Sequence, residues 1–242
     1  KIFRRSKMAK KDTDFRSYVK YFWLLVFGAP FALILALLLT WAGLFGALPS
    51  TEEIANPKSF LATEILSADG KQIGTFFMEN RVHADYNDLP PHLVNALIAT
   101  EDERYHDHAG IDFRGLARAV VTLGGGGGGS TITQQLAKQM FHGEGSSNIV
   151  ARVVQKLKEW VISLQLERRY SKEEILAMYF NQFDFLYQGV GIHNASNVYF
   201  GKLPSELHIE EAAMLVGMFK NPYAYNPSKA DRTEIALNRR NT

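Results

Sequence analysis

The chain has 242 residues, a formal net charge of +2 and no cysteine. Its length accommodates one domain of roughly 150–200 residues plus accessory segments. The small net charge argues against a nucleic-acid-binding protein, and the lack of cysteine excludes a disulfide framework and a thiolate metal site. Because the sequence starts at Lys1 and stops inside an Arg-rich helical pattern, we expect it to be a piece of a longer protein.

A basic segment followed by an uncharged one predicts a membrane anchor. Residues 1–20 carry eight Lys or Arg against two Asp, and residues 21–51 carry no charge. About 20 apolar residues cross a bilayer, and the basic flank stays in the cytoplasm. A cleaved signal peptide would have an apolar region of only about 7–15 residues. We therefore expect a cytoplasmic tail over 1–20, an uncleaved single-pass plasma-membrane anchor over 21–48, and an extracytoplasmic remainder.

The next segment, 49–85, is expected to hold a linker and a short β-hairpin. Two strands are predicted within 64–77, around Asp69-Gly70, a dipeptide that suits a type I′ turn. We expect an ordinary structural hairpin. From Leu89 onwards the apolar pattern is helical, and we expect one mainly α-helical domain over 86–242.

The helix that follows Pro90-Pro91 places a carboxylate on its apolar face. Proline suits the first turn of a helix. Val94, Leu97 and Glu101 then fall at i, i+3 and i+7 of a helical period. Burial disfavours the charged form of a carboxyl group, which suits a general acid or base. The structural alternative is a helix C-terminus with solvated charges.

Six glycines, 124–129, precede a helix with a polar start. Glycine loses the most backbone entropy on ordering, so a mobile loop is expected there. Ser130 or Thr131 is a good N-cap. The polar face of the helix carries four side chains: Thr131, Gln134, Gln135 and Lys138. A free helix N-terminus with hydroxyls and a lysine suits an anionic ligand, and a flexible linker before an ordinary helix is the alternative.

Three further helices are predicted. The helix over 149–166 should bury an apolar face and expose a polar one. The apolar face holds Val150, Val153, Val154, Leu157, Trp160, Val161 and Leu164, and the polar face holds Arg152, Gln155, Lys156 and Glu159. Ser171 and Glu174 form a capping-box pattern for a helix to about residue 181. The last strong helix, 209–219, ends before Asn221-Pro222.

Four of these segments, in order, resemble motifs of the peptidoglycan glycosyltransferase family, whose domain polymerises lipid II. EDERYHDHAG (101–110) fits E-D-x-x-F-x-x-H-x-G with Tyr105 in the Phe position, and residues 129–138 fit G-S-T-x-T-Q-Q with its following lysine. Residues 155–159 fit R-K-x-x-E, except that Gln155 replaces Arg. Residues 172–181 fit K-x-x-I-L-x-x-Y-x-N. Four motifs in order at plausible spacing are very specific.

The resemblance implies a mainly α, lysozyme-like domain that joins lipid II to a nascent glycan strand at the bilayer. Glu101 would be the general base for the acceptor hydroxyl, and undecaprenyl pyrophosphate would leave with inversion. Glu159 would be the second essential carboxylate, which orients the acceptor or holds Mg²⁺ or Mn²⁺. Substrate binding is expected of ten residues: Asp102, His108, Ser130, Thr131, Gln134, Gln135, Lys138, Arg152, Lys156 and Asn181. Among them Lys138 and Arg152 would face the pyrophosphate, with Lys156 compensating for the missing arginine.

The anchor and the hairpin resemble those of a bifunctional class A penicillin-binding protein. No S-x-x-K motif followed by S-x-N and K-T-G is present, so the sequence assigns no transpeptidation. Two rival functions are a lysozyme-like glycan hydrolase and a non-catalytic, membrane-tethered scaffold that binds wall precursors. A hydrolase needs no pyrophosphate site, and a scaffold needs no base on an apolar face.

Overall fold

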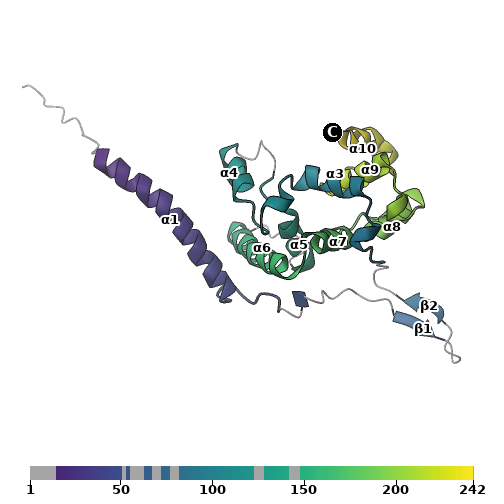
Figure 1. Cartoon of the computed structure of the whole chain (residues 1–242), viewed down its shortest axis with the longest axis horizontal. Coiled ribbons are helices and arrows are strands. Elements are labelled where there is room, and N and C mark those ends of the chain that lie inside the picture. The colour runs from purple at the N-terminus through teal and green to yellow at the C-terminus, as the bar shows by residue number, and fades with distance from the viewer. Residues whose placement is uncertain are drawn as a thin grey trace, which may run out of the picture. The chain divides into compact units, whose positions relative to one another are not determined.

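The computed structural model (Figure 1) describes residues 15–50, 53–54, 63–66, 72–76, 82–122, 128–141 and 148–241. The chain divides into two compact units, Lys1–Gly46 and Ala47–Thr242. The first unit carries the apolar helix. The second carries a two-stranded sheet and the helical domain.

The helix of the first unit, α1 (Phe15–Trp41), is long and apolar enough to cross a membrane over Ser17–Trp41, with a mean hydropathy of 2.6. Twenty-five residues at 1.5 Å each span about 37 Å, against about 30 Å for a hydrocarbon core. The helix ends seven residues before the boundary predicted at residue 48. Gly43 and Gly46 follow it with positive φ angles of 82° and 101°, a conformation that stops a right-handed helix.

Two short strands, β1 (Thr63–Leu66) and β2 (Gln72–Phe76), pair in antiparallel fashion at the segment for which a hairpin was expected. Thr63 lies opposite Phe76, and the register shifts between Ile65 and Leu66. The turn predicted at Asp69-Gly70 lies outside the described residues.

The rest of the second unit is helical, which confirms the mainly α prediction (Figure 1). Its α-helices are α3 (Pro91–Glu101), α4 (Phe113–Val121), α5 (Ile132–Phe141), α6 (Ile149–Arg169), α7 (Lys172–Gln182), α8 (Ile192–Phe200), α9 (Ile209–Met218) and α10 (Thr233–Arg240). The described residues also form single-turn 3₁₀ helices: η1 (Tyr86–Asp88), η2 (Tyr105–Asp107), η3 (Pro204–Glu206) and η4 (Ala230–Arg232).

The core lies between α5 and its neighbours. Helix α5 packs against both α6 and α7, and α3 packs against α9. Leu97 of α3, Leu136 of α5 and Ile162 of α6 are completely buried, as is Phe180 of α7. This packing fixes the end of α3 relative to the start of α5, where two of the predicted motifs meet.

Helix α6 departs from its predicted amphipathic faces. Val150 and Val153, expected in the core, are 71% and 56% exposed, whereas Glu159, expected on the wet face, is 4% exposed. The buried residues of α6 begin only at Glu159. The first turns therefore extend past the core of the described residues, and their apolar side chains stay exposed. Ile149 is likewise 75% exposed.

The capping box predicted at the start of α7 is confirmed. Ser171 Oγ accepts from the Glu174 N–H over 3.2 Å, and Glu174 Oε2 accepts from the Ser171 N–H over 2.7 Å. The backbone hydrogen bond from Ser171 lowers the pKa of Glu174 below its ordinary value, because it stabilises the charged carboxylate.

Candidate functional site

Two cavities share Ser130, just before α5. The larger, of about 1220 Å³, is lined by side chains of α5 and α6 and by the residues that follow α7 and α9. The smaller, of about 210 Å³, is lined by the end of α3, by α4 and by Gly128, Gly129 and Ser130. Two adjoining cavities can hold two reactants side by side.

Glu101 lies at this junction. It is the last residue of α3 and lies C-terminal to the buried Val94 and Leu97. It also lines the smaller cavity. Its Oε2 accepts a hydrogen bond of 2.9 Å from Gln135 Nε2, and Gln135 lines the larger cavity. A half-buried carboxylate therefore reaches one cavity and is held by a side chain of the other.

Four cations line the larger cavity: Lys138, Arg152, Lys156 and Lys220. Lys138 and Arg152 are exposed to it, so both predicted pyrophosphate ligands lie in one place. Lys220 was not among the predicted site residues, because it follows α9 and no motif marks it. Only the packing of α9 against the rest of the domain brings this lysine to the cavity.

Glu159 is a buried carboxylate whose two oxygens are both engaged. Its Oε1 accepts from Gln155 Nε2 over 3.1 Å, and its Oε2 accepts from Lys156 Nζ over 2.9 Å. Lys156 Nζ also donates to Ser130 Oγ over 2.9 Å. Gln155, which replaces the family arginine, therefore supports Glu159 as a neutral donor.

This arrangement does not fit the metal ion that the family resemblance predicted at Glu159. The ammonium group of Lys156 lies where a cation would approach Oε2. Within the described part of the chain, no three metal-ligating side chains gather in one place. A divalent ion at this position would first have to displace Lys156.

The N-terminus of α5 is occupied by a carboxylate of the protein itself, contrary to the expectation of a free anion site. Asp102 Oδ2 accepts from the Ile132 N–H over 3.0 Å. Both oxygens of Asp102 also lie 3.1 Å from His108 Nε2. The Gly110 N–H donates to His108 Nδ1 over 3.2 Å, so Nε2 carries the proton and donates to Asp102. The pair thus positions α5.

Thr131, Gln134 and Asn181 are also tied to the protein. Thr131 Oγ1 and Gln134 Nε2 both donate to the Gly110 carbonyl, over 2.7 and 3.1 Å. Asn181 exchanges two hydrogen bonds with the backbone of Ala84, of 3.0 and 2.8 Å. Thr131 and Asn181, like Asp102 and His108, are thus held by contacts within the protein, and direct substrate binding by these four residues stays a prediction. Gln134 Oε1 has no partner among the described residues and remains a candidate.

A buried network behind the site holds the loop that follows α3. Lys172 Nζ donates to the His108 carbonyl over 2.7 Å and to Glu167 Oε1 over 2.8 Å. It also lies 4.2 Å from the centre of the Tyr105 ring. Burial, together with the charges of Glu167 and Asp102, raises the pKa of Tyr105 well above its ordinary value. The network fixes the backbone that carries His108.

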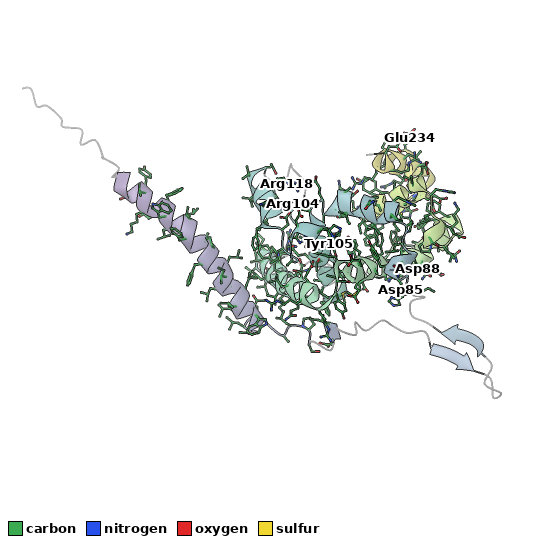
Figure 2. All side chains as sticks on the ribbon, viewed as in Figure 1. Asp85, Asp88, Arg104, Tyr105, Arg118 and Glu234 are labelled. Atoms are coloured by element: carbon green, nitrogen blue, oxygen red, sulfur yellow. The ribbon has the colours of Figure 1, made fainter. Side chains whose placement is uncertain are left out.

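The smaller cavity has an ion pair at its edge. Arg104 pairs with Asp112, and Asp112 Oδ1 also accepts from the Arg114 N–H at the start of α4. Arg118 of α4 lines the same cavity (Figure 2 labels Arg104 and Arg118). A Cβ at Gly115 would meet the carboxylate of Asp112, so that side chain would have to move to admit it.

The end of the glycine run passes close to α4. A Cβ at Gly129 would lie 3.3 Å from the Ala119 Cβ and 3.4 Å from the Leu116 Cα. The remainder of the run, 124–127, lies outside the described residues, so the mobility predicted for 124–129 stays a prediction. Gly128 and Gly129 themselves line the smaller cavity.

Comparisons with known proteins give the geometry a context. The family described as "Transglycosylase" matches residues 69–242. Penicillin-binding protein 2a of Streptococcus pneumoniae is 36% identical over 246 residues, which cover all of this chain and 33% of that protein. Penicillin-binding protein 1A of Neisseria flavescens is 39% identical, over 74% of this chain and 22% of that protein. Penicillin-binding protein 1A of Aquifex aeolicus is 34% identical, over 89% of this chain and 29% of that protein. The chain thus spans a third or less of these relatives.

Proposed function

The chain belongs to the transglycosylase family, and from this premise we propose that it is a peptidoglycan glycosyltransferase that polymerises lipid II into glycan strands. The observation that carries the proposal is the position of Glu101. Its carboxylate lines the smaller cavity and accepts from Gln135 of the larger one, so it lies where two cation-lined cavities adjoin. A transferase that joins two sugar substrates needs such a junction, because the base must reach the bond being formed.

In the proposed reaction, Glu101 takes the proton from the 4-hydroxyl of the acceptor sugar. The hydroxyl oxygen then attacks the anomeric carbon of the donor from the face opposite the pyrophosphate. As this carbon–oxygen bond forms, the bond to the pyrophosphate oxygen breaks, so the configuration inverts. The undecaprenyl pyrophosphate leaves with the bonding electron pair, and the proton remains on Glu101.

The cations of the larger cavity would stabilise the leaving group. Negative charge grows on the pyrophosphate in the transition state, so fixed positive charges that face it lower the barrier. Lys138 and Arg152 are exposed to the cavity, and Lys220 lies in the same lining. Lys156 is committed to Glu159 and Ser130, so we assign it to holding that carboxylate.

The proposal assigns no step to a metal ion, because the surroundings of Glu159 do not fit one. Mg²⁺ commonly binds through one or two carboxylates plus substrate phosphates. A metal brought in by the pyrophosphate therefore stays a prediction. It is checked by comparing polymerisation in EDTA with polymerisation after Mg²⁺ or Mn²⁺ is added back.

We also propose that the protein works at the plasma membrane. Helix α1 would be a single-pass anchor with its basic N-terminal side in the cytoplasm. In the second unit, α4 and the first turns of α6 expose large apolar side chains: Phe113, Val120, Val121, Ile149, Val150 and Val153. Such a group of residues suits contact with lipid, where the polyprenyl tail of the substrate resides. By the names of its relatives, the chain would supply the transferase part of a penicillin-binding protein.

One assay separates this function from its rivals. The detergent-solubilised protein is incubated with lipid II and the products are resolved by gel electrophoresis. We expect polymer. Degradation of added glycan strands would instead identify a hydrolase, and lipid II binding without turnover would identify a scaffold. The same assay applied to Glu101→Gln has a matched control in Glu210→Gln. Glu210 is a carboxylate in the first turn of α9, and its replacement should leave polymerisation as in the unaltered protein.

A further inference from the structure

Two hydrogen bonds connect the hydroxyl of Tyr179 to the carboxylate of Glu101. Tyr179 Oη donates to Gln135 Oε1 over 2.9 Å. Gln135 Nε2 then donates to Glu101 Oε2, also over 2.9 Å. The three residues come from α7, α5 and α3. One amide therefore ties the carboxylate to two other helices.

Only one orientation of the Gln135 amide satisfies both neighbours. A carboxylate can only accept, so Glu101 requires the NH₂ end and the oxygen end must face Tyr179. Burial, together with the charge of Glu101, raises the pKa of Tyr179 well above its ordinary value. The phenol therefore keeps its proton and can donate it. If the Gln135 amide were rotated by 180°, its oxygen would face the Glu101 carboxylate. Both oxygens are acceptors, so no hydrogen bond could form between them.

The ring of Tyr179 is held independently of its hydroxyl. The side chain is fully buried, and its ring stacks on Phe219 with centroids 4.9 Å apart and planes inclined by 14°. Tyr179 lines neither of the two cavities, whereas Gln135 and Phe219 line the larger one. The hydrogen bond of the hydroxyl toward the site goes to Gln135, and phenylalanine can replace tyrosine without losing the packing.

We propose that Tyr179 is a positioning residue whose hydroxyl fixes the Gln135 amide, so that Glu101 Oε2 is held in place. The other oxygen, Oε1, is then left to take the proton from the acceptor hydroxyl. This inference rests on the proposed glycosyl transfer. It matters because general-base catalysis requires the base within hydrogen-bond reach of the proton, and small displacements of a reacting group are costly.

The test compares lipid II polymerisation by Tyr179→Phe and by a matched control. Tyr170→Phe removes a similar hydrogen bond, from Tyr170 Oη to the Ile54 carbonyl at 3.0 Å, far from Glu101 in sequence and not in either cavity. We expect Tyr179→Phe to lower kcat about tenfold with KM within twofold, and Tyr170→Phe to leave both unchanged. An unchanged kcat for Tyr179→Phe, or an equal loss in the control, would overturn the proposal.

A double-substitution cycle shows whether Tyr179 acts through Gln135. Gln135→Ala should lower kcat at least as much as Tyr179→Phe does. Adding Tyr179→Phe to Gln135→Ala should then cost nothing further, because the amide it orients is gone. A second tenfold loss in the double variant would mean that the hydroxyl acts by another route, and would refute the inference.

A readout that needs no turnover separates this inference from the proposed function. If the unaltered protein makes no polymer, the glycosyl transfer is wrong. The positioning is still tested by a crystal structure of Tyr179→Phe. We expect Gln135 to have left Glu101 Oε2 in that structure. A retained 2.9 Å contact, with the fold intact, would show that the hydroxyl is not what holds the amide.

Discussion

Removing the ammonium group of Lys156 tests how the buried carboxylate of Glu159 is stabilised. Glu159 is 4% exposed and its Oε2 is satisfied by Lys156, whose own side chain is 40% exposed. Lys156→Met keeps the apolar stem and leaves Oε2 without a donor. Leaving a buried acceptor unsatisfied costs about 1–3 kcal/mol, and the open side of Lys156 favours the lower half of that range. For a unit of this size we expect Tm to fall by roughly 2–8 °C.

The assay is thermal unfolding of Lys156→Met, Glu159→Gln and the double variant, followed by circular dichroism. A glutamine at 159 carries no charge, so it should not depend on the ammonium group. The double variant should therefore be about as stable as Glu159→Gln alone. If Lys156→Met melts like the unaltered protein, or if the two losses simply add, the ion pair does not stabilise the buried carboxylate.

Three further outcomes follow from the same contacts. Lys138→Ala and Arg152→Ala should each slow polymerisation on the order of 10²-fold, measured as kcat/KM for lipid II, with Lys138 the larger because its motif is intact; a larger loss for Arg152 would reverse that ranking. Replacing glycines 124–129 with alanine should slow polymerisation while sparing binding of a soluble pyrophosphate-linked sugar, since Gly129 has little room for a Cβ beside α4; unchanged polymerisation would make the glycines incidental. Glu174→Ala should lower Tm at pH 7, because it removes the carboxylate that accepts from the Ser171 N–H. The lowered pKa of Glu174 means that the capping contribution exists above about pH 4.3 and is lost as pH falls through the folded value. The difference in Tm should therefore shrink at low pH, and a constant difference would contradict the cap.

Local chemistry made much of the fold predictable. Proline before α3, the capping box at Ser171 and the Asn221-Pro222 break all act within a few residues, and each matches an observed helix boundary to within a few residues. The uncharged run likewise predicted α1. The helix ends at Trp41, seven residues before the end of the anchor predicted over 21–48, because the glycines that follow it turn the backbone.

The candidate site was predictable only in part, because its polar groups are satisfied across long sequence separations. The periodicity of α3 placed Glu101 correctly at the end of an apolar face. No local pattern indicated that Asp102 would accept from the N-terminus of α5, at Ile132, 30 residues later. The sequence of α5 is the same whether its N-terminal N–H groups are free or bound. Only the folded position of the residue after α3 shows that Asp102 binds one of them. The exposed Val150 shows the same limit for helix faces, since amphipathicity does not tell where the partner helix stops.

The most direct test of the central claim is the rate of lipid II polymerisation by Glu101→Gln. The amide can still accept from Gln135 Nε2, so the fold and lipid II binding should be retained, with a Tm close to that of the unaltered protein. It cannot take a proton from the acceptor hydroxyl. We expect the rate to fall by about 10²–10⁴-fold or more, the size of a general-base contribution. A Glu101→Gln variant that polymerises lipid II at close to the original rate would contradict the account.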